Sequence, residues 1–180
     1  VGEDEIAEVV RGNTEFAFDL YGMIGRETGN MIYSPYSISI ALAMTYTGAR
    51  ENTADEMADA MHYTLPEERL HPALNSLEQE IESHADQILG SGNEPLRLNV
   101  VNSIWGQKAY EFQQPFLDTI ARNYGAGLRL VDFVSNPEQC RVTINDWVAE
   151  ETEDKIQDLI PEDIIDIMTR LILVNAIYFK

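Results

Sequence analysis

Residues 169–180, with the sequence TRLILVNAIYFK, constrain the fold of this chain more than any other stretch. Alternate side chains of an extended strand point to opposite faces, and here both faces are apolar. One face carries Leu171, Leu173, Ile177 and Phe179, and the other carries Ile172, Val174, Ala176 and Tyr178. A strand that is apolar on both faces belongs in the middle of a sheet that is covered on both sides. The stretch therefore predicts the central strand of a layered fold.

The other segments predict an α+β fold. Helical patterns and helix-start signals occur first, over residues 13–24, 34–48, 53–61 and 66–89, and recur over 115–124 and 137–154. Strand patterns occur later, over residues 96–104 and 128–133. Helices and strands do not alternate regularly, so a parallel βαβ sheet is not indicated. Because a central strand needs neighbours on both sides and few strands are available, we expect these residues to be part of an incomplete domain.

Three helix starts are indicated by capping residues. Asn13 precedes one helical pattern, and Thr53 with Glu56 has the spacing of a capping box. Ser34 is followed by Pro35, which suits the first helical position because it has no N–H to leave unpaired. A further helix, over residues 137–154, carries an apolar stripe of Cys140, Ile144, Trp147 and Val148.

The charge of the chain excludes several classes of partner. The formal net charge is −19, whereas a protein that binds a phosphate backbone needs clustered Lys and Arg. The helix predicted over 66–89 has Arg69 against Glu67, Glu68, Glu78, Glu80, Glu82 and Asp86, so heparin binding is not expected. No apolar stretch is long enough to predict a transmembrane span. We therefore expect no nucleic acid, heparin or membrane partner.

Residue types that carry catalysis or bind metals lack the spacing that they need. A serine nucleophile requires a base and an oxyanion hole, and no Gly-x-Ser-x-Gly motif occurs. His62, His71 and His84 fall in polar helical patterns, and their spacing puts no two of them one turn apart on a helix face. Cys140 is the single cysteine, so no internal disulfide is expected. We expect no catalytic residue, metal site or cofactor.

The segment 150–166 is strongly acidic, with eight acidic residues against one lysine and a local charge of −7. A calcium-binding loop would need alternating ligands and a glycine, which are absent here. We interpret the segment as a solvated face.

Four motifs in order resemble the serpin family. They are NTEFAFDLY at 13–21, NMIYSPYSISIALAMTYTGARENTADEM at 30–57, INDWVAEETEDKIQDLI at 144–160 and LILVNAIYFK at 171–180. The order and separation of the motifs are also similar, and the resemblance covers nearly all of the chain. It implies the N-terminal half of one serpin domain, over residues 1–180, with N-terminal helices packed with strands of a large mixed sheet.

The resemblance implies inhibition of a serine or cysteine protease by a mechanical route. In serpins, an exposed loop near the C-terminus is cleaved by the protease and inserts into the main sheet, releasing stored strain. No reactive-centre residue occurs in this chain, so the implied partners are a protease, bound through the absent loop, and the remaining C-terminal half of the domain. The alternative is a non-inhibitory serpin that acts as a binding or chaperone-like protein. Most members of the family are extracellular, so the resemblance implies an extracellular protein, with a cytoplasmic protein as the alternative.

The resemblance also assigns roles to specific residues. Ser34, Ser37 and Asn175 are implied to lie at the shutter, the region where two strands part to admit the loop. Buried hydroxyl and amide groups there can exchange partners as the strands separate, so no polar group is left unpaired. The alternative is that the two serines only cap their helix and fill space. Ser39 is interpreted as a packing residue.

A second set of residues belongs to the helix that is implied to lie across the main sheet. Asn145, Trp147, Thr152 and Lys155 have the spacing that the family shows there. This helix must give way when the loop enters the sheet.

Overall fold

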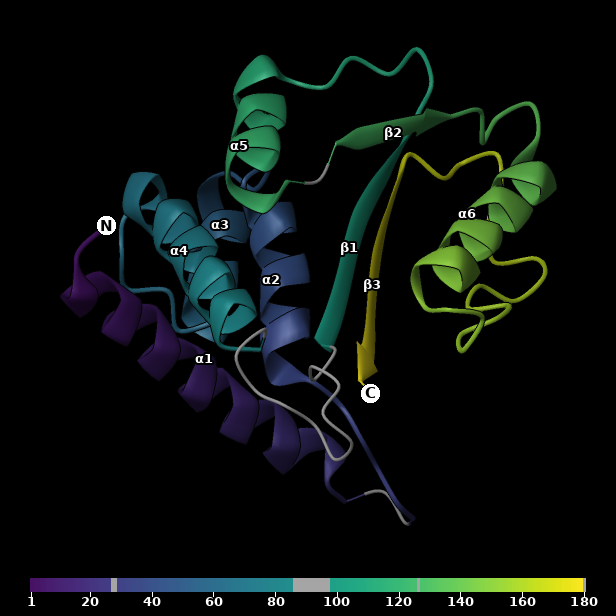
Figure 1. Ribbon diagram of the computed structural model, residues 1–180. Coiled ribbons are helices and arrows are strands. Elements are labelled where there is room, and N and C mark those ends of the chain that lie inside the picture. The colour runs from purple at the N-terminus through teal and green to yellow at the C-terminus, as the bar shows by residue number, and fades with distance from the viewer. Residues whose placement is uncertain (27–28, 86–97, 126, 180) are drawn as a thin grey trace. The chain divides into compact units, whose positions relative to one another are not determined.

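The computed structural model describes residues 1–26, 29–85, 98–125 and 127–179 (Figure 1). They belong to two compact units, Val1–Ile88 and Leu89–Lys180. The first unit is helical and the second contains the sheet, so the α+β prediction is confirmed. No helix in these ranges is both long and apolar enough to cross a membrane.

The first unit consists of α1 (Glu3–Ile24), α2 (Pro35–Tyr46), α3 (Glu51–Ala60) and α4 (Glu67–Ala85), with α1 packed against α2 and α4. α2 is buried nearly all round, because Ile40, Ala43 and Met44 are buried on different sides of it. Gly12 allows α1 to approach the loop after α3 closely, since a Cβ there would lie 2.5 Å from the carbonyl oxygen of His62. This approach therefore requires a residue without a side chain at position 12.

Two of the three predicted helix starts are wrong. α1 begins ten residues before Asn13, with Glu3, Asp4 and Glu5 in its first turn, where acidic side chains favour the helix dipole. α3 is capped at Arg50, so Thr53 lies inside the helix and forms no capping box. Ser34, by contrast, is confirmed as the N-cap of α2, with Pro35 at the first helical position.

The second unit is built on a mixed three-stranded sheet in the order β2–β1–β3. β1 (Leu98–Gln107) pairs in parallel with β2 (Leu128–Val131) and antiparallel with β3 (Leu171–Phe179). Among the described residues, β1 takes the middle position and β3 lies at an edge, so the central position predicted for residues 169–180 is not observed in this part of the sheet. Residues 96 and 97 of the predicted strand 96–104 lie outside the described residues.

Two helices complete the second unit, α5 (Gln114–Tyr124) and α6 (Pro137–Glu151). α5 ends at Gly125, whose φ of 56° suits a residue without a side chain. α6 runs beside one face of the sheet (Figure 1), and the predicted stripe is confirmed because Cys140, Ile144 and Val148 are buried with Val174 and Ala176 of β3. One of the two apolar faces of β3 is thus covered by α6.

Candidate functional site

Ser34 and Ser37 form a hydrogen-bonded pair at the start of α2. The Ser34 hydroxyl accepts the Ser37 backbone N–H at 3.3 Å, and the two hydroxyl oxygens lie 3.0 Å apart. Ser37 is only 1% exposed, so its hydroxyl is a buried polar group that needs a partner. The pair is therefore more than a single N-cap, because the second serine adds a side-chain hydrogen bond to the first.

We expect Ser37→Ala to lower the free energy of unfolding of the full-length protein containing this chain by about 1–3 kcal/mol, because it removes one partner of a buried hydrogen bond. If the pair lies at the shutter, the variant also polymerises more on mild heating. Thermal unfolding and a native gel after heating measure the two effects. The control is Ser39→Ala, since Ser39 is equally buried at 2% exposure. Wild-type behaviour of both variants would support the cap-and-fill alternative.

Asn175 makes a side-chain hydrogen bond across the sheet. It lies opposite Asn102 in the antiparallel register of β3 and β1, and its amide donates to the Asn102 side-chain oxygen at 2.7 Å. No local pattern in the sequence selects Asn102, because the register that places it beside Asn175 spans 73 residues. The two asparagines form a polar contact between two strands whose other residues are mostly apolar.

The predicted shutter residues belong to different units of the structure. Ser34 and Ser37 lie in the first unit and Asn175 in the second. The structure supports the local pairing of each, and the role of the three residues together stays a prediction.

Asn145 holds the segment that follows α6. Residues 153–168, termed here the return segment, lead from α6 back to β3. The Asn145 amide donates to the carbonyl of Ile160 at 2.9 Å, and its side-chain oxygen accepts the N–H of Ile160 at 2.9 Å. Asn145 is 5% exposed, so its side chain is largely shielded from water, and both hydrogen bonds are partly buried. One side chain thereby forms hydrogen bonds with both the N–H and the carbonyl of Ile160.

Thr152 closes the C-terminus of α6. Its hydroxyl donates to the carbonyl of Val148 at 2.7 Å and accepts the N–H of Ile156 at 3.2 Å, while the residue is fully buried. The N–H of Asp154 bonds the carbonyl of Ala149 at 2.8 Å and that of Glu153 bonds Glu150 at 3.3 Å. This is the Schellman pattern, in which glycine usually occupies the position of Glu153.

Glu153 adopts a φ of 50°, in the left-handed region where a Cβ is disfavoured. We expect Glu153→Gly to raise the free energy of unfolding by about 1 kcal/mol, because glycine adopts this conformation without steric cost. Urea unfolding of the full-length protein measures the change. Glu150→Gly is the matched control, since glycine inside the helix should destabilise by about 1 kcal/mol instead. A loss of stability in both variants would contradict the strain at Glu153.

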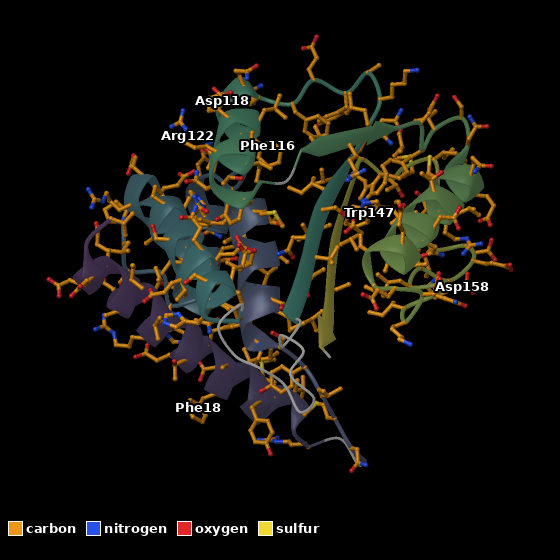
Figure 2. All side chains as sticks on the ribbon, in the orientation of Figure 1. Phe18, Phe116, Asp118, Arg122, Trp147 and Asp158 are labelled. Atoms are coloured by element: carbon orange, nitrogen blue, oxygen red, sulfur yellow. The ribbon has the colours of Figure 1, made fainter. Side chains whose placement is uncertain are left out.

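Trp147 contacts the sheet through an aromatic and cationic cluster. Its ring lies 5.8 Å from that of Trp105 in an edge-to-face arrangement. The guanidinium of Arg129 lies 4.9 Å from the Trp147 ring and 5.3 Å from the Trp105 ring. Figure 2 shows Trp147 on the side of α6 that faces the strands. These contacts connect α6 to β1 and β2.

Lys155 is the predicted residue of this set with the weakest structural connection to α6. Its backbone N–H donates to the carbonyl of Thr152 at 3.0 Å, and its side chain is exposed. The structure thus places Asn145 and Trp147 on α6, Thr152 at its C-cap and Lys155 in the return segment. Their role in loop insertion stays a prediction.

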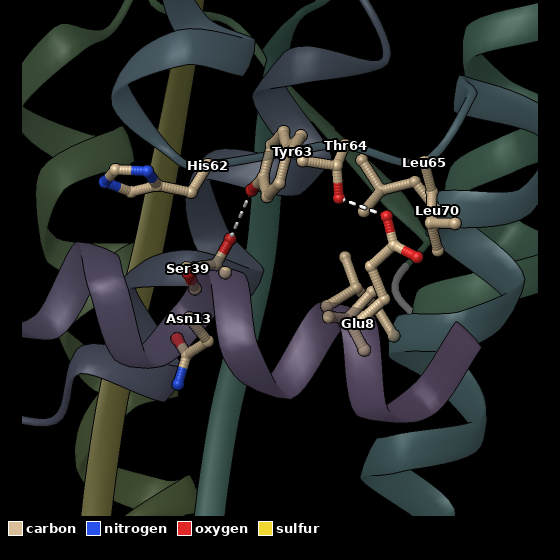
Figure 3. Close-up of a pocket in the computed structure, with 11 residues that line it drawn as sticks. Glu8, Asn13, Ser39, His62, Tyr63, Thr64, Leu65 and Leu70 are labelled. Carbon is tan, nitrogen blue, oxygen red and sulfur yellow. Dashed lines mark hydrogen bonds between the residues drawn. The ribbon is translucent and has the colours of Figure 1, made fainter. Parts of the chain in front are cut away.

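Two cavities differ greatly in size. The cavity in Figure 3 lies in the first unit, among Asn13, Ser39, Tyr63, Thr64 and Glu8, and its volume of about 10 Å³ suits no more than a water molecule. A cavity of about 500 Å³ in the second unit is lined by β3 residues 171–175 and by return-segment residues that include Leu159, Ile160 and Ile164. Its lining is mostly apolar and includes the first five residues of β3. Only the second cavity has room for another segment of chain.

The three histidines occupy different environments. His71 is 2% exposed, which corrects the expectation that it lies on a polar helix, and burial lowers its pKa to about 4. His62 lies beside Glu15 and Asp19, with ring nitrogens 3.3 and 2.8 Å from their carboxylate oxygens. His84 is exposed. Across the described ranges, no group of three or more His, Cys, Asp or Glu side chains is placed to hold a metal ion.

Comparison with known proteins identifies a family. Residues 11–180 match the model of the family described as Serpin (serine protease inhibitor). The leukocyte elastase inhibitor of Equus caballus is 41% identical to this chain over 170 residues, which are 93% of the chain and 42% of that relative. The chain therefore spans less than half the length of this curated relative.

Solved structures give the same result. A cleaved serpin 42Da has a TM-score of 0.81 and 27% identity, over 98% of this chain and 44% of that one. Ovalbumin from the emu (Dromaius novaehollandiae) has a TM-score of 0.80 and 27% identity, over 96% of this chain and 46% of that one.

Proposed function

Because the chain belongs to the serpin family, we propose that residues 1–180 are the N-terminal portion of one serpin domain that inhibits a serine protease by loop insertion. Serpins are protease inhibitors rather than enzymes. The relatives named leukocyte elastase inhibitor favour an elastase-like serine protease as the target, with a cysteine protease as the alternative. The remainder of the domain, which would carry the reactive loop, is the second partner.

The observation that carries this proposal is the environment of β3. β3 pairs with β1 on one side, and no strand in the described part of the chain pairs with its other side. The cavity of about 500 Å³ is lined by this strand and the return segment. A loop entering there as a new strand would gain ladder hydrogen bonds and bury apolar surface. Insertion would hold the protease as an acyl-enzyme and release strain from a metastable fold.

The test is covalent complex formation by a full-length serpin that contains this chain. It is incubated with elastase-like, trypsin-like, chymotrypsin-like and subtilisin-like serine proteases and with a cysteine protease, and the products are separated in SDS. We expect an SDS-stable complex with at least one serine protease. Residues 1–180 alone are the control and should form none, since they contain no stretch that resembles a reactive loop. Absence of any complex from the full-length protein would favour a non-inhibitory serpin.

We also propose secretion of the full-length protein, which follows the family majority, with a cytoplasmic protein as the alternative. Its distribution between cells and medium in the natural source tests this.

A further inference from the structure

α6 has two interfaces of different chemistry. The sheet-facing interface is mainly apolar, with Cys140, Ile144 and Val148 packed on β-strand residues and Trp147 in ring contact with Trp105. The interface with the return segment combines apolar packing with hydrogen bonds, and these come from Arg141 and Asn145, which lie one helical turn apart and both contact Ile160. The two stripes lie side by side on one helix because each repeats at a spacing of four residues.

Arg141 is a buried charge that the sequence alone does not reveal. It is 9% exposed, and its Nη1 donates to the carbonyl of Ile160 at 3.0 Å. Its Nε lies 3.0 Å from both carboxylate oxygens of Glu138, and its Nη2 donates to Oε1 at 2.7 Å. Glu138 therefore neutralises and orients the guanidinium, and the hydrogen bonds from Arg141 lower the pKa of Glu138.

Ile160 is held by three hydrogen bonds from α6. Its carbonyl accepts from Arg141 and Asn145, and its N–H donates to Asn145. Separating this contact would leave the Asn145 amide and the Nη1 of Arg141 without this partner, and buried polar groups are costly when unpaired. The contacts between α6 and the strands are apolar packing and ring contacts, so opening this interface leaves fewer buried hydrogen-bonding groups unpaired.

We propose that Arg141 is a positioning residue which, with Asn145, keeps the return segment bound to α6 while α6 moves off the sheet, so that the two move as one body. The contact among Glu138, Arg141, Asn145 and Ile160 is termed the latch. This inference rests on the proposed function, because loop insertion is the event that requires α6 to move. The existence of the latch itself does not depend on that function.

The first test measures amide hydrogen exchange at Ile160 in the full-length protein. We expect Arg141→Gln to accelerate exchange of the Ile160 amide by about 10-fold, as one hydrogen bond to a charged donor is lost. Amides of β3, such as that of Val174, should keep their rates. Arg141→Lys should be intermediate, because it can reach the carbonyl but cannot pair with Glu138 through two nitrogens. Thr143→Ala, at an exposed position of α6, is the control and should match the wild type. An unchanged Ile160 rate in Arg141→Gln would overturn the proposal.

The second test follows the wild-type protein during reaction with its protease, using Cys140 as a probe. Its thiol is 5% exposed and faces the sheet, so a pulse of thiol reagent should modify it only while α6 is off the sheet. We expect Cys140 to be modified during complex formation while the Ile160 amide stays protected in the same molecules. Loss of Ile160 protection together with Cys140 modification would overturn movement as one body, and so would a Cys140 that never reacts. If no complex forms with any protease, the proposed function fails, while the first test still decides the latch.

Discussion

Asn145→Ala in a full-length serpin containing this chain should lower the free energy of unfolding by about 2–4 kcal/mol, the largest effect that we expect from a single substitution. The substitution removes both hydrogen bonds to Ile160 and leaves the N–H of Ile160 without its partner. Arg141 can still donate to the carbonyl, so the return segment is weakened rather than released. Chemical denaturation with a two-state fit measures the change.

The matched control for this substitution is its neighbour. Asp146 is exposed on α6, so Asp146→Ala should change the free energy of unfolding by no more than about 0.5 kcal/mol. Equal stability of Asn145→Ala and Asp146→Ala would mean that Asn145 does not hold the return segment.

Stability should also depend on pH through His71. Burial lowers its pKa to about 4, whereas an unfolded histidine has a pKa of about 6.5. Glu67 lies 3.9 Å from the ring and favours the charged form, but it is itself 42% exposed and burial dominates. Between these two pKa values the unfolded state binds more protons than the folded state. Above pH 6.5 the ring is neutral in both states and does not reduce the free energy of unfolding. As the pH drops to about 4, this effect of His71 lowers the free energy of unfolding by about 3 kcal/mol.

This pH dependence is measured by subtracting the free energy of unfolding of His71→Phe from that of the wild type at each pH. The subtraction removes the pH dependence that comes from carboxylates, because both proteins share it. We expect the free energy of unfolding of the wild type to fall more steeply between pH 6.5 and pH 4. His84→Gln, which changes an exposed histidine, should keep the steep slope. Parallel curves for the wild type and His71→Phe would show that burial does not penalise the charged ring.

Sequence patterns predicted correctly those features that depend on residues close together in the chain. Ser34 and Pro35 determine the start of α2 through their own backbone geometry, and the stripe of α6 follows from helical periodicity. Asn13 and Thr53 resembled caps but lie inside helices, since α1 begins at Glu3 and α3 at Glu51. In α1, the residues before Asn13 take part in the packing of the unit, and Val9 is buried there. A capping residue is only a weak constraint when packing favours a longer helix.

Polar groups buried by distant contacts could not be predicted. Arg141 resembles a surface residue in the sequence, and its burial depends on Ile160, which is 19 positions away. Asn102 acquires its partner through a strand register, and His71 is buried by the packing of α4. The role of Asn145 was inferred from family resemblance, whereas its two hydrogen bonds to Ile160 became evident only in the structure.

The central claim is that the sheet containing β3 accepts a further strand. The most direct measurement is the thermal unfolding midpoint of a full-length serpin containing this chain, before and after its exposed loop is cut by a protease that it does not inhibit. The account predicts a clearly higher midpoint after cleavage, because the inserted loop pairs with β3 and strain is released. An unchanged or lower midpoint would contradict insertion and would favour the non-inhibitory alternative.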